Sequence, residues 1–215
     1  MKKQHCKILN YVNVEHFLVR TSTLTLKESI VLNMLWKRSE NGEFLDSVLF
    51  LEKTSGIKRK TIDKYIEKFK ELKIIYSLKR KYFFYPDYEK YLDELQELDR
   101  ENEFVINSQN TYYFTYTFYH FDLAKQLGLN VTQYFFLDIH IGLFLKKGYG
   151  TSPKSYTMRL LGIEERYFFE IKKQLFEKGY LEKFDESDFI KVSVSIINDF
   201  GIARDETKKH NKKVV

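Results

Sequence analysis

A segment of the chain recurs 106 residues further on, and this internal repeat limits the possible folds more than any other feature of the sequence. Residues 51–57 read Leu-Glu-Lys-Thr-Ser-Gly-Ile, and residues 157–163 read Thr-Met-Arg-Leu-Leu-Gly-Ile, with Gly56 matching Gly162. In both copies a charged segment follows, with apolar residues at helical spacing. The shared displacement predicts one supersecondary unit that is used twice.

Each copy is predicted to form two helices joined by a glycine turn, with a β-hairpin after the second helix. Glycine suits the turn because a left-handed backbone costs it little. Ile57 and Ile163 then anchor the second helix to the core, and the residues that follow project from its first turn. A recognition helix presents positions of this kind to a groove of DNA.

Chain length and composition predict two domains of mainly helical structure. A chain of 215 residues with 43% hydrophobic content can bury two small cores, and one larger domain is the alternative. Two prolines and nine glycines favour helices with a few strands, so the expected class is mainly α with small β-hairpins (α+β). The predicted segments are a first domain at 8–86, an acidic connector helix at 87–107, a second domain at 108–200 and a basic disordered tail at 201–215.

Two helical features can be placed more closely. Thr25 with Glu28 three residues later matches a capping box that opens a helix, which is predicted to end at Asn41-Gly42. In the connector, apolar residues recur at three- and four-residue spacing, which indicates packing against a neighbouring domain or, alternatively, a dimer seam.

The sequence offers no sign of catalysis or of a membrane. A single cysteine, Cys6, and the lack of a long apolar run predict a cytoplasmic protein with no membrane partner. Association with the nucleoid is expected only if the basic residues of the chain bind DNA. The five histidines are scattered, and His140 is expected to be packed or hydrogen-bonded in a helix. We therefore expect no enzyme, catalytic residue, metal, cofactor or small-molecule substrate.

Charge divides the two copies. Residues 46–85 contain 11 basic and five acidic side chains, whereas residues 151–195 contain eight of each. The two copies are thus expected to perform different tasks.

The basic residues of the first copy gather at two places that a duplex would meet. The front of its second helix offers Lys58, Arg59, Lys60, Thr61 and Lys64, and the hairpin tip offers Lys79, Arg80 and Lys81. Cations at both places would release counterions from DNA. Arg59 is the first choice for reading a base, because a guanidinium can donate to O6 and N7 of guanine.

Residues 51–62 and 69–75 resemble the winged helix-turn-helix family of bacterial DNA-binding proteins. The similarity lies in a leucine, a turn glycine, an aliphatic residue, a basic pair, a threonine and a further aliphatic residue. The resemblance implies two tandem winged-helix domains, a recognition helix in the major groove and a wing at residues 79–81.

The second copy keeps the skeleton and loses the basic front. Glu164 and Glu165 replace the basic pair, and an acidic tip at residues 185–188 replaces the basic one. Carboxylates there would repel phosphate, which favours dimerisation or partner binding over DNA contact. A second DNA site remains an alternative through Arg166, Lys172 and Lys173.

The resemblance extends to a class of whole proteins. Two winged helices in one chain are similar to plasmid and phage replication initiators, proteins of mobile genetic elements, and residues 18–28 are similar to the opening of those proteins. The expected partner is double-stranded DNA, bound by sequence in the control of transcription or replication, with a homodimer as a further alternative. The competing hypotheses are a winged-helix module that binds only protein and a protein that stacks single-stranded bases on its aromatic residues.

Overall fold

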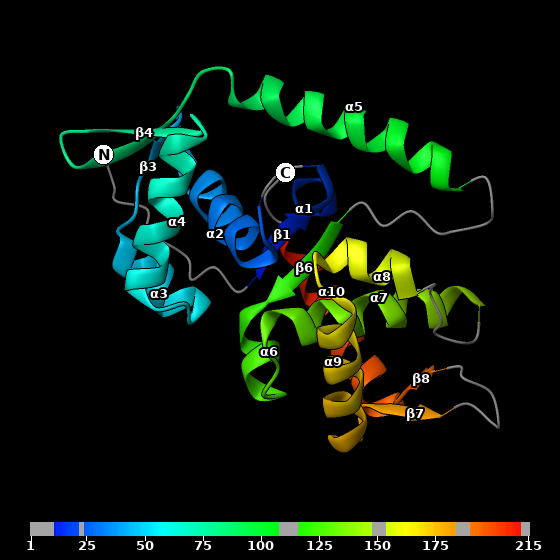
Figure 1. The fold of residues 1–215 in the computed structure, drawn as a ribbon. Coiled ribbons are helices and arrows are strands. Elements are labelled where there is room, and N and C mark those ends of the chain that lie inside the picture. Colours follow the sequence, from blue (N-terminus) through cyan, green and yellow to red (C-terminus); the bar gives the residue numbers. More distant parts are fainter. Residues whose placement is uncertain (1–10, 22–23, 108–115, 148–153, 184–189, 212–215) are drawn as a thin grey trace.

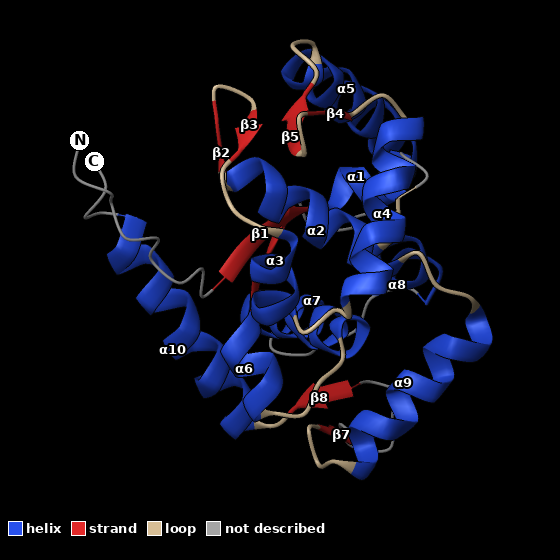
Figure 2. Ribbon diagram, turned by 90° about the vertical axis from the view of Figure 1, so that its left-hand side faces the viewer, coloured by secondary structure: helices blue, strands red, loops and turns tan. Residues whose placement is uncertain are grey.

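The computed structural model describes residues 11–21, 24–107, 116–147, 154–183 and 190–211. The fold is mainly helical with small antiparallel sheets, as predicted (Figure 1). Figure 2 shows the same elements from the side, with the strand at residues 11–15 among the helices, the strands between residues 39 and 84 near the top and those between residues 181 and 192 near the bottom. We call residues 11–107 the first half and residues 116–211 the second half.

The described elements of the two halves follow the same order, except that the first half has two further strands, β2 and β3 at residues 39–40 and 43–44, before its glycine turn. The first half contains β1 (Tyr11–Glu15), α1 (His16–Thr21), α2 (Leu26–Lys37), β2 (Ser39–Glu40), β3 (Glu43–Phe44), α3 (Val48–Ser55), α4 (Arg59–Glu71), β4 (Ile75–Leu78), β5 (Lys81–Phe84) and α5 (Tyr88–Asn107). The second contains β6 (Tyr116–His120), α6 (Phe121–Gln126), α7 (Val131–Lys147), α8 (Lys154–Leu161), α9 (Glu165–Glu177), β7 (Leu181–Lys183), β8 (Ile190–Val192) and α10 (Val194–Asn211). Helices α3 and α8 have 8 residues each, and α4 and α9 have 13 each. The repeat therefore extends well beyond the motif that reveals it.

The halves are joined by a two-stranded antiparallel sheet that takes one strand from each. Asn13, at the centre of β1, pairs with Phe118, at the centre of β6, while Tyr11 pairs with His120 and Glu15 with Tyr116. Because the two strands occupy equivalent places in their halves and pair about their midpoints, an approximate twofold axis relates them. No local sequence pattern specifies this pairing, because it joins segments about 100 residues apart.

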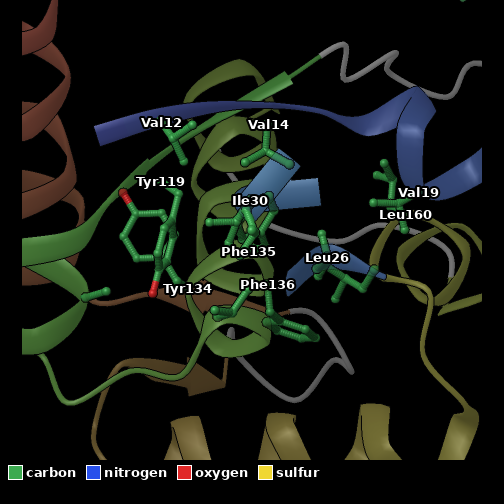
Figure 3. Close-up of a cluster of buried hydrophobic side chains, with 14 of the residues drawn as sticks. Val12, Val14, Val19, Leu26, Ile30, Tyr119, Tyr134, Phe135, Phe136 and Leu160 are labelled. Atoms are coloured by element: carbon green, nitrogen blue, oxygen red, sulfur yellow. The ribbon is translucent and has the colours of Figure 1, made fainter. Parts of the chain in front are cut away.

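The buried apolar side chains of both halves form one continuous cluster. Figure 3 shows Val12 and Val14 of β1 and Ile30 of α2 gathered with Tyr134 and Phe135 of α7. All of these side chains are at most 1% exposed. The two predicted domains thus share a single core, and burial of their apolar surface stabilises both halves together.

Helices α2 and α7 begin with equivalent capping boxes. The Thr25 side chain accepts from the backbone N–H of Glu28, and the Glu28 carboxylate accepts from the backbone N–H of Thr25, which confirms the predicted box. In the second half the Asn130 and Gln133 side chains exchange the same two bonds, at 2.9 and 3.1 Å. Each box satisfies amide groups that a helix start leaves without an intrahelical acceptor.

One residue of each capping box, Glu28 or Gln133, also binds the helix that follows the glycine turn. Lys68 on α4 donates to the Glu28 carboxylate at 2.8 Å. At the corresponding place Gln174 on α9 accepts from the Gln133 amide at 2.7 Å. The first half thus has an ion pair where the second half has a hydrogen bond between two neutral amides. The two halves place this contact alike and differ in its charge.

The last helix of each half is held by an arginine–aspartate pair. Arg20 of α1 binds Asp99 of α5 with both side chains at most 2% exposed, so one side of α5 is closely packed. In the second half Arg204 of α10 binds Asp138 of α7 at 2.5 Å. The prediction of a disordered tail from residue 201 is wrong for 201–211, because α10 continues to Asn211. The ion pair ties the helix to α7 near residue 204, and residues 212–215 lie outside the described part.

The first half carries a hairpin that the sequence analysis missed. Helix α2 ends at Lys37, and Asn41-Gly42 forms the turn between β2 and β3 instead of ending the helix. Both turn residues have positive φ, 51° and 79°, which Asn-Gly adopts readily. The hairpin extends the sheet to four strands in the order β2-β3-β5-β4. None of the helices in the described residues is long and apolar enough to span a membrane.

Candidate nucleic-acid interface

Helix α4 presents one apolar side to the core and its opposite side to solvent. Gly56 ends α3 with φ of 69°, and Lys58 is the N-cap of α4. Ile62, Ile66 and Phe69 are at most 1% exposed. Their burial fixes which residues of α4 face outward.

The predicted residues at the front of α4 lie on that outward side. Lys58, Arg59, Lys60 and Lys64 are exposed, whereas Thr61 is half-buried. In the described part of the chain no ion pair involves Lys58, Lys60 or Lys64. Three ammonium groups can therefore meet an external anion without first breaking an internal bond.

Arg59 is held only weakly within the molecule. Its side chain is 63% exposed, and its Nε lies 4.0 Å from an Asp63 oxygen that is itself well exposed. Such surface pairs contribute little, about 0.3–0.5 kcal/mol on a helix. Its backbone N–H donates to the Glu52 carboxylate of α3 at 3.0 Å. Since Glu52 occupies this helix end, the side chains rather than the first amide are the groups that α4 offers to a phosphate.

The tip of the β4–β5 hairpin is a two-residue turn made of two cations. Lys79 and Arg80 both have positive φ, 49° and 66°, and both side chains are exposed. Turns of this kind favour Asn-Gly, and non-glycine residues in this region cost of order 1–3 kcal/mol each. Next to them Lys81 donates to the Glu43 carboxylate of β3 at 2.5 Å.

The fold brings parts of the two predicted basic groups to one place. Arg59 of α4 lines the same surface groove, of about 590 Å³, as Arg80 and Lys81 of the hairpin. The acidic side chains in that groove, Glu43 and Asp46, are paired with Lys81 and Arg38. An anion in the groove would meet Arg59 and Arg80 first.

The equivalent front of the second half has the opposite character. Glu164 is the N-cap of α9, and Glu165 forms a 2.5 Å ion pair with Lys154 of α8. Both carboxylates are exposed. The acidic hairpin tip predicted at 185–188 lies outside the described residues. The helix front alone offers negative charge where the first half offers positive charge.

The three residues predicted as a second DNA site do not form one patch. Arg166 and Lys173 are exposed on α9, and Lys173 lies 3.8 Å from Glu177. Lys172 is half-buried, because its position corresponds to that of the buried Ile66 in α4. The charge of Lys172 instead acts on His140, whose pKa is lowered by burial and, to a smaller extent, by this charge.

His140 is fully enclosed by the core of the second half. Its Nδ1 lies 2.8 Å from the carbonyl oxygen of Phe136, and its ring stacks on the Phe136 ring at 4.2 Å. The pKa of His140 is lowered to about 4, mainly by burial; the bond to the Phe136 carbonyl opposes this shift, and the Lys172 charge adds a smaller lowering. The expectation of a packed, hydrogen-bonded histidine is confirmed.

Two carboxylates beside the predicted basic residues were not recognised from the sequence. Glu52 caps α4, and Glu43 holds Lys81. The Asn41-Gly42 pair was a usable signal, because it predicts a hairpin that places Glu43 on a strand beside β5. Nothing in the local sequence marks Glu52 as a cap for a helix seven residues away.

Comparison of the chain with models of protein families, with curated proteins and with solved structures finds no significant match.

Proposed function

We propose that the chain binds double-stranded DNA, with the front of α4 in the major groove and the β4–β5 turn on the flanking backbone. In this proposal the first half is a winged helix-turn-helix, and α3, α4 and the hairpin are its two helices and wing. The element order and the sheet order β3-β5-β4 support it. Control of transcription and control of replication are both compatible with such a module.

The convergence of Arg59 and Arg80 on one groove is the observation that carries the proposal. The two residues are 21 positions apart in the sequence and come from different elements, and both are exposed. A charge run on a helix is usually just a solvated surface, but two separate cationic elements that line one concavity favour an extended polyanion.

The strained turn adds independent support. Two cations stand where Asn-Gly would stabilise the hairpin, as it does in β2–β3. Backbone strain of this kind concentrates at functional sites. Contact of Lys79 and Arg80 with phosphates would explain why the less stable turn is present.

We propose a different task for the second half, namely binding a second copy or another protein. The acidic front of α9 would repel a duplex, and the separation of Lys172 from Arg166 removes the basic patch that a second DNA site requires. The first half alone would then provide DNA contact.

The test is a pair of matched double substitutions measured by fluorescence anisotropy on random duplex DNA and on the DNA upstream of the chain's own gene. Arg59→Ala with Lys60→Ala should weaken binding by about 10- to 100-fold and reduce the salt dependence, with unchanged circular dichroism. Arg166→Ala with Lys173→Ala removes the same charge from the equivalent helix and should leave binding unchanged. Equal affinity of the first variant and the unaltered chain would exclude α4 from the interface.

A further inference from the structure

The outer face of the β4–β5 hairpin carries three neighbouring aromatic rings that the core does not need. Alternation along the strands turns Ile75 and Phe84 inward, where they are 1% and 5% exposed. Tyr76 and Phe83, which pair across the two strands, point to the other face. We call Tyr76, Phe83 and the following Tyr85 the aromatic platform.

The rings of the platform contact one another rather than the interior. Tyr76 stacks on Phe83 with centroids 5.4 Å apart and planes at 19°, and Tyr76 lies 5.0 Å from Tyr85. Tyr82, on the inner face, packs against the core. The three platform residues are not among the described residues that pack against it. Tyr76 and Phe83 are half-buried, Tyr85 is 39% exposed, and Leu78 beside the platform is 56% exposed. An apolar surface of this kind on a projecting hairpin indicates a binding role (Figure 1).

Cations lie at one end of the platform. Lys81 lies on the outer face, as the cross-strand partner of Leu78, and the turn residues Lys79 and Arg80 follow at the tip. One carboxylate, Glu43, opposes Phe83 and is already bound to Lys81. Flat rings followed by positive charge complement the alternating bases and phosphates of a nucleic-acid strand.

We propose that the aromatic platform stacks the unpaired bases of single-stranded nucleic acid while Lys79 and Arg80 hold its phosphates. Within a duplex the base faces are covered by their neighbours, so only a single strand can use the rings. The proposed occupant is therefore distinct from the duplex at α4. The hairpin would combine a tip that holds backbone with a face that holds bases.

The experiment measures anisotropy of labelled oligo(dT) and oligo(U) with the full chain at moderate salt, with DNA and RNA as the two sources of this chemistry. Tyr76→Ala with Phe83→Ala should weaken oligo(dT) binding by about 10- to 100-fold, the loss expected for one or two stacked bases. Its duplex affinity should change little, because α4 and the turn are unaltered.

Two controls separate stacking from other causes. Phe169→Ala removes a 50% exposed ring of α9 that lies 5.4 Å from the Lys154 ammonium, and it should leave oligo(dT) binding unchanged. Tyr76→Phe with Tyr85→Phe keeps the rings and should bind as the unaltered chain does. An abasic oligonucleotide of equal length should bind the unaltered chain more weakly than oligo(dT), and this measurement needs no variant.

The outcomes are distinct from those for duplex binding. Equal affinity for abasic and normal oligonucleotides, or full oligo(dT) binding by Tyr76→Ala with Phe83→Ala, would overturn the platform and favour a protein on this face. Arg59→Ala with Lys60→Ala should lose duplex binding and retain oligo(dT) binding. If it retained both, the duplex proposal would fail while the platform would stand.

Discussion

The fronts of α4 and α9 have the same backbone and opposite surfaces. Each helix has 13 residues, follows an eight-residue helix and is preceded by a glycine of positive φ. Lys58 and Arg59 stand on α4 where Glu164 and Glu165 stand on α9. The core residues preserve the frame of each half, while the exposed residues determine the charge that each half presents to a partner.

The two glycine turns differ in how much free space surrounds them. A Cβ built on Gly56 meets nothing within 4 Å, so the first turn faces open space. A Cβ on Gly162 would lie 3.2 Å from a Val19 methyl group of α1, so the second turn packs against the first half. The turn beside the basic helix is accessible to a partner, whereas its counterpart already serves the contact between halves.

The largest effect that separates the halves is expected at their two arginine–aspartate pairs. Asp99→Ala removes the carboxylate that binds the buried Arg20 guanidinium, whose side chain is 2% exposed, and should lower the free energy of unfolding by about 3–5 kcal/mol. Arg204→Ala should cost about half as much, because the Arg204 side chain is already 30% exposed. Urea unfolding measures both, and equal losses would contradict the assignment of the tighter clamp to the first half.

Low pH should destabilise the fold through the second half, which contains the buried His120 and His140. Burial lowers both pKa values, that of His140 to about 4 from an ordinary 6.5. Between these values the unfolded chain takes up a proton that the folded chain refuses, so stability is lost as the pH falls from about 6.5 to 4. The loss through His140 is about 3 kcal/mol.

The measurement is urea unfolding of the unaltered chain and of His140→Phe across that pH range. The variant lacks the titrating group, so its stability should fall much less with acid. Parallel pH profiles for the two proteins would show that His140 does not control the acid response.

The smallest effect is expected at the hairpin turns. Lys79→Asn with Arg80→Gly gives the β4–β5 turn the residues of the β2–β3 turn, and should raise the free energy of unfolding by about 1–2 kcal/mol. The same variant should bind duplex more weakly, and its salt dependence should be shallower by about 0.9 for each phosphate that the turn no longer neutralises.

The opposite exchange is the matched control. Asn41→Lys with Gly42→Arg places two cations in the β2–β3 turn, where φ is also positive at both residues, and should destabilise the fold. If the first variant were no more stable than the unaltered chain, strain at Lys79 and Arg80 would not explain their presence.

Local features of the fold were predictable from sequence because they depend on neighbouring residues. The capping box at Thr25 and Glu28 and the packed His140 follow from short spacings and helix periodicity. The helix at α10 was missed because its C-terminal part is polar, and the ion pair between Arg204 and Asp138 joins residues far apart in the chain.

The candidate site was predictable in composition and not in geometry. The basic residues of α4 and of the turn could be named from their charges, but the groove that unites Arg59 with Arg80 depends on the β2–β3 hairpin and its position beside β5. The pairing of β1 with β6 is likewise a contact between distant segments, which no local pattern specifies.

Exchange of the charged pairs between the first turns of α4 and α9 shows whether duplex binding depends on the charge at the start of α4. Lys58→Glu with Arg59→Glu gives α4 the front of α9, and Glu164→Lys with Glu165→Arg gives α9 the front of α4. With duplex affinity measured against salt, the first variant should lose about 100-fold or more and most of the salt dependence. The second should bind at least as tightly as the unaltered chain. Full duplex binding by the first variant would show that the start of α4 does not contact the duplex.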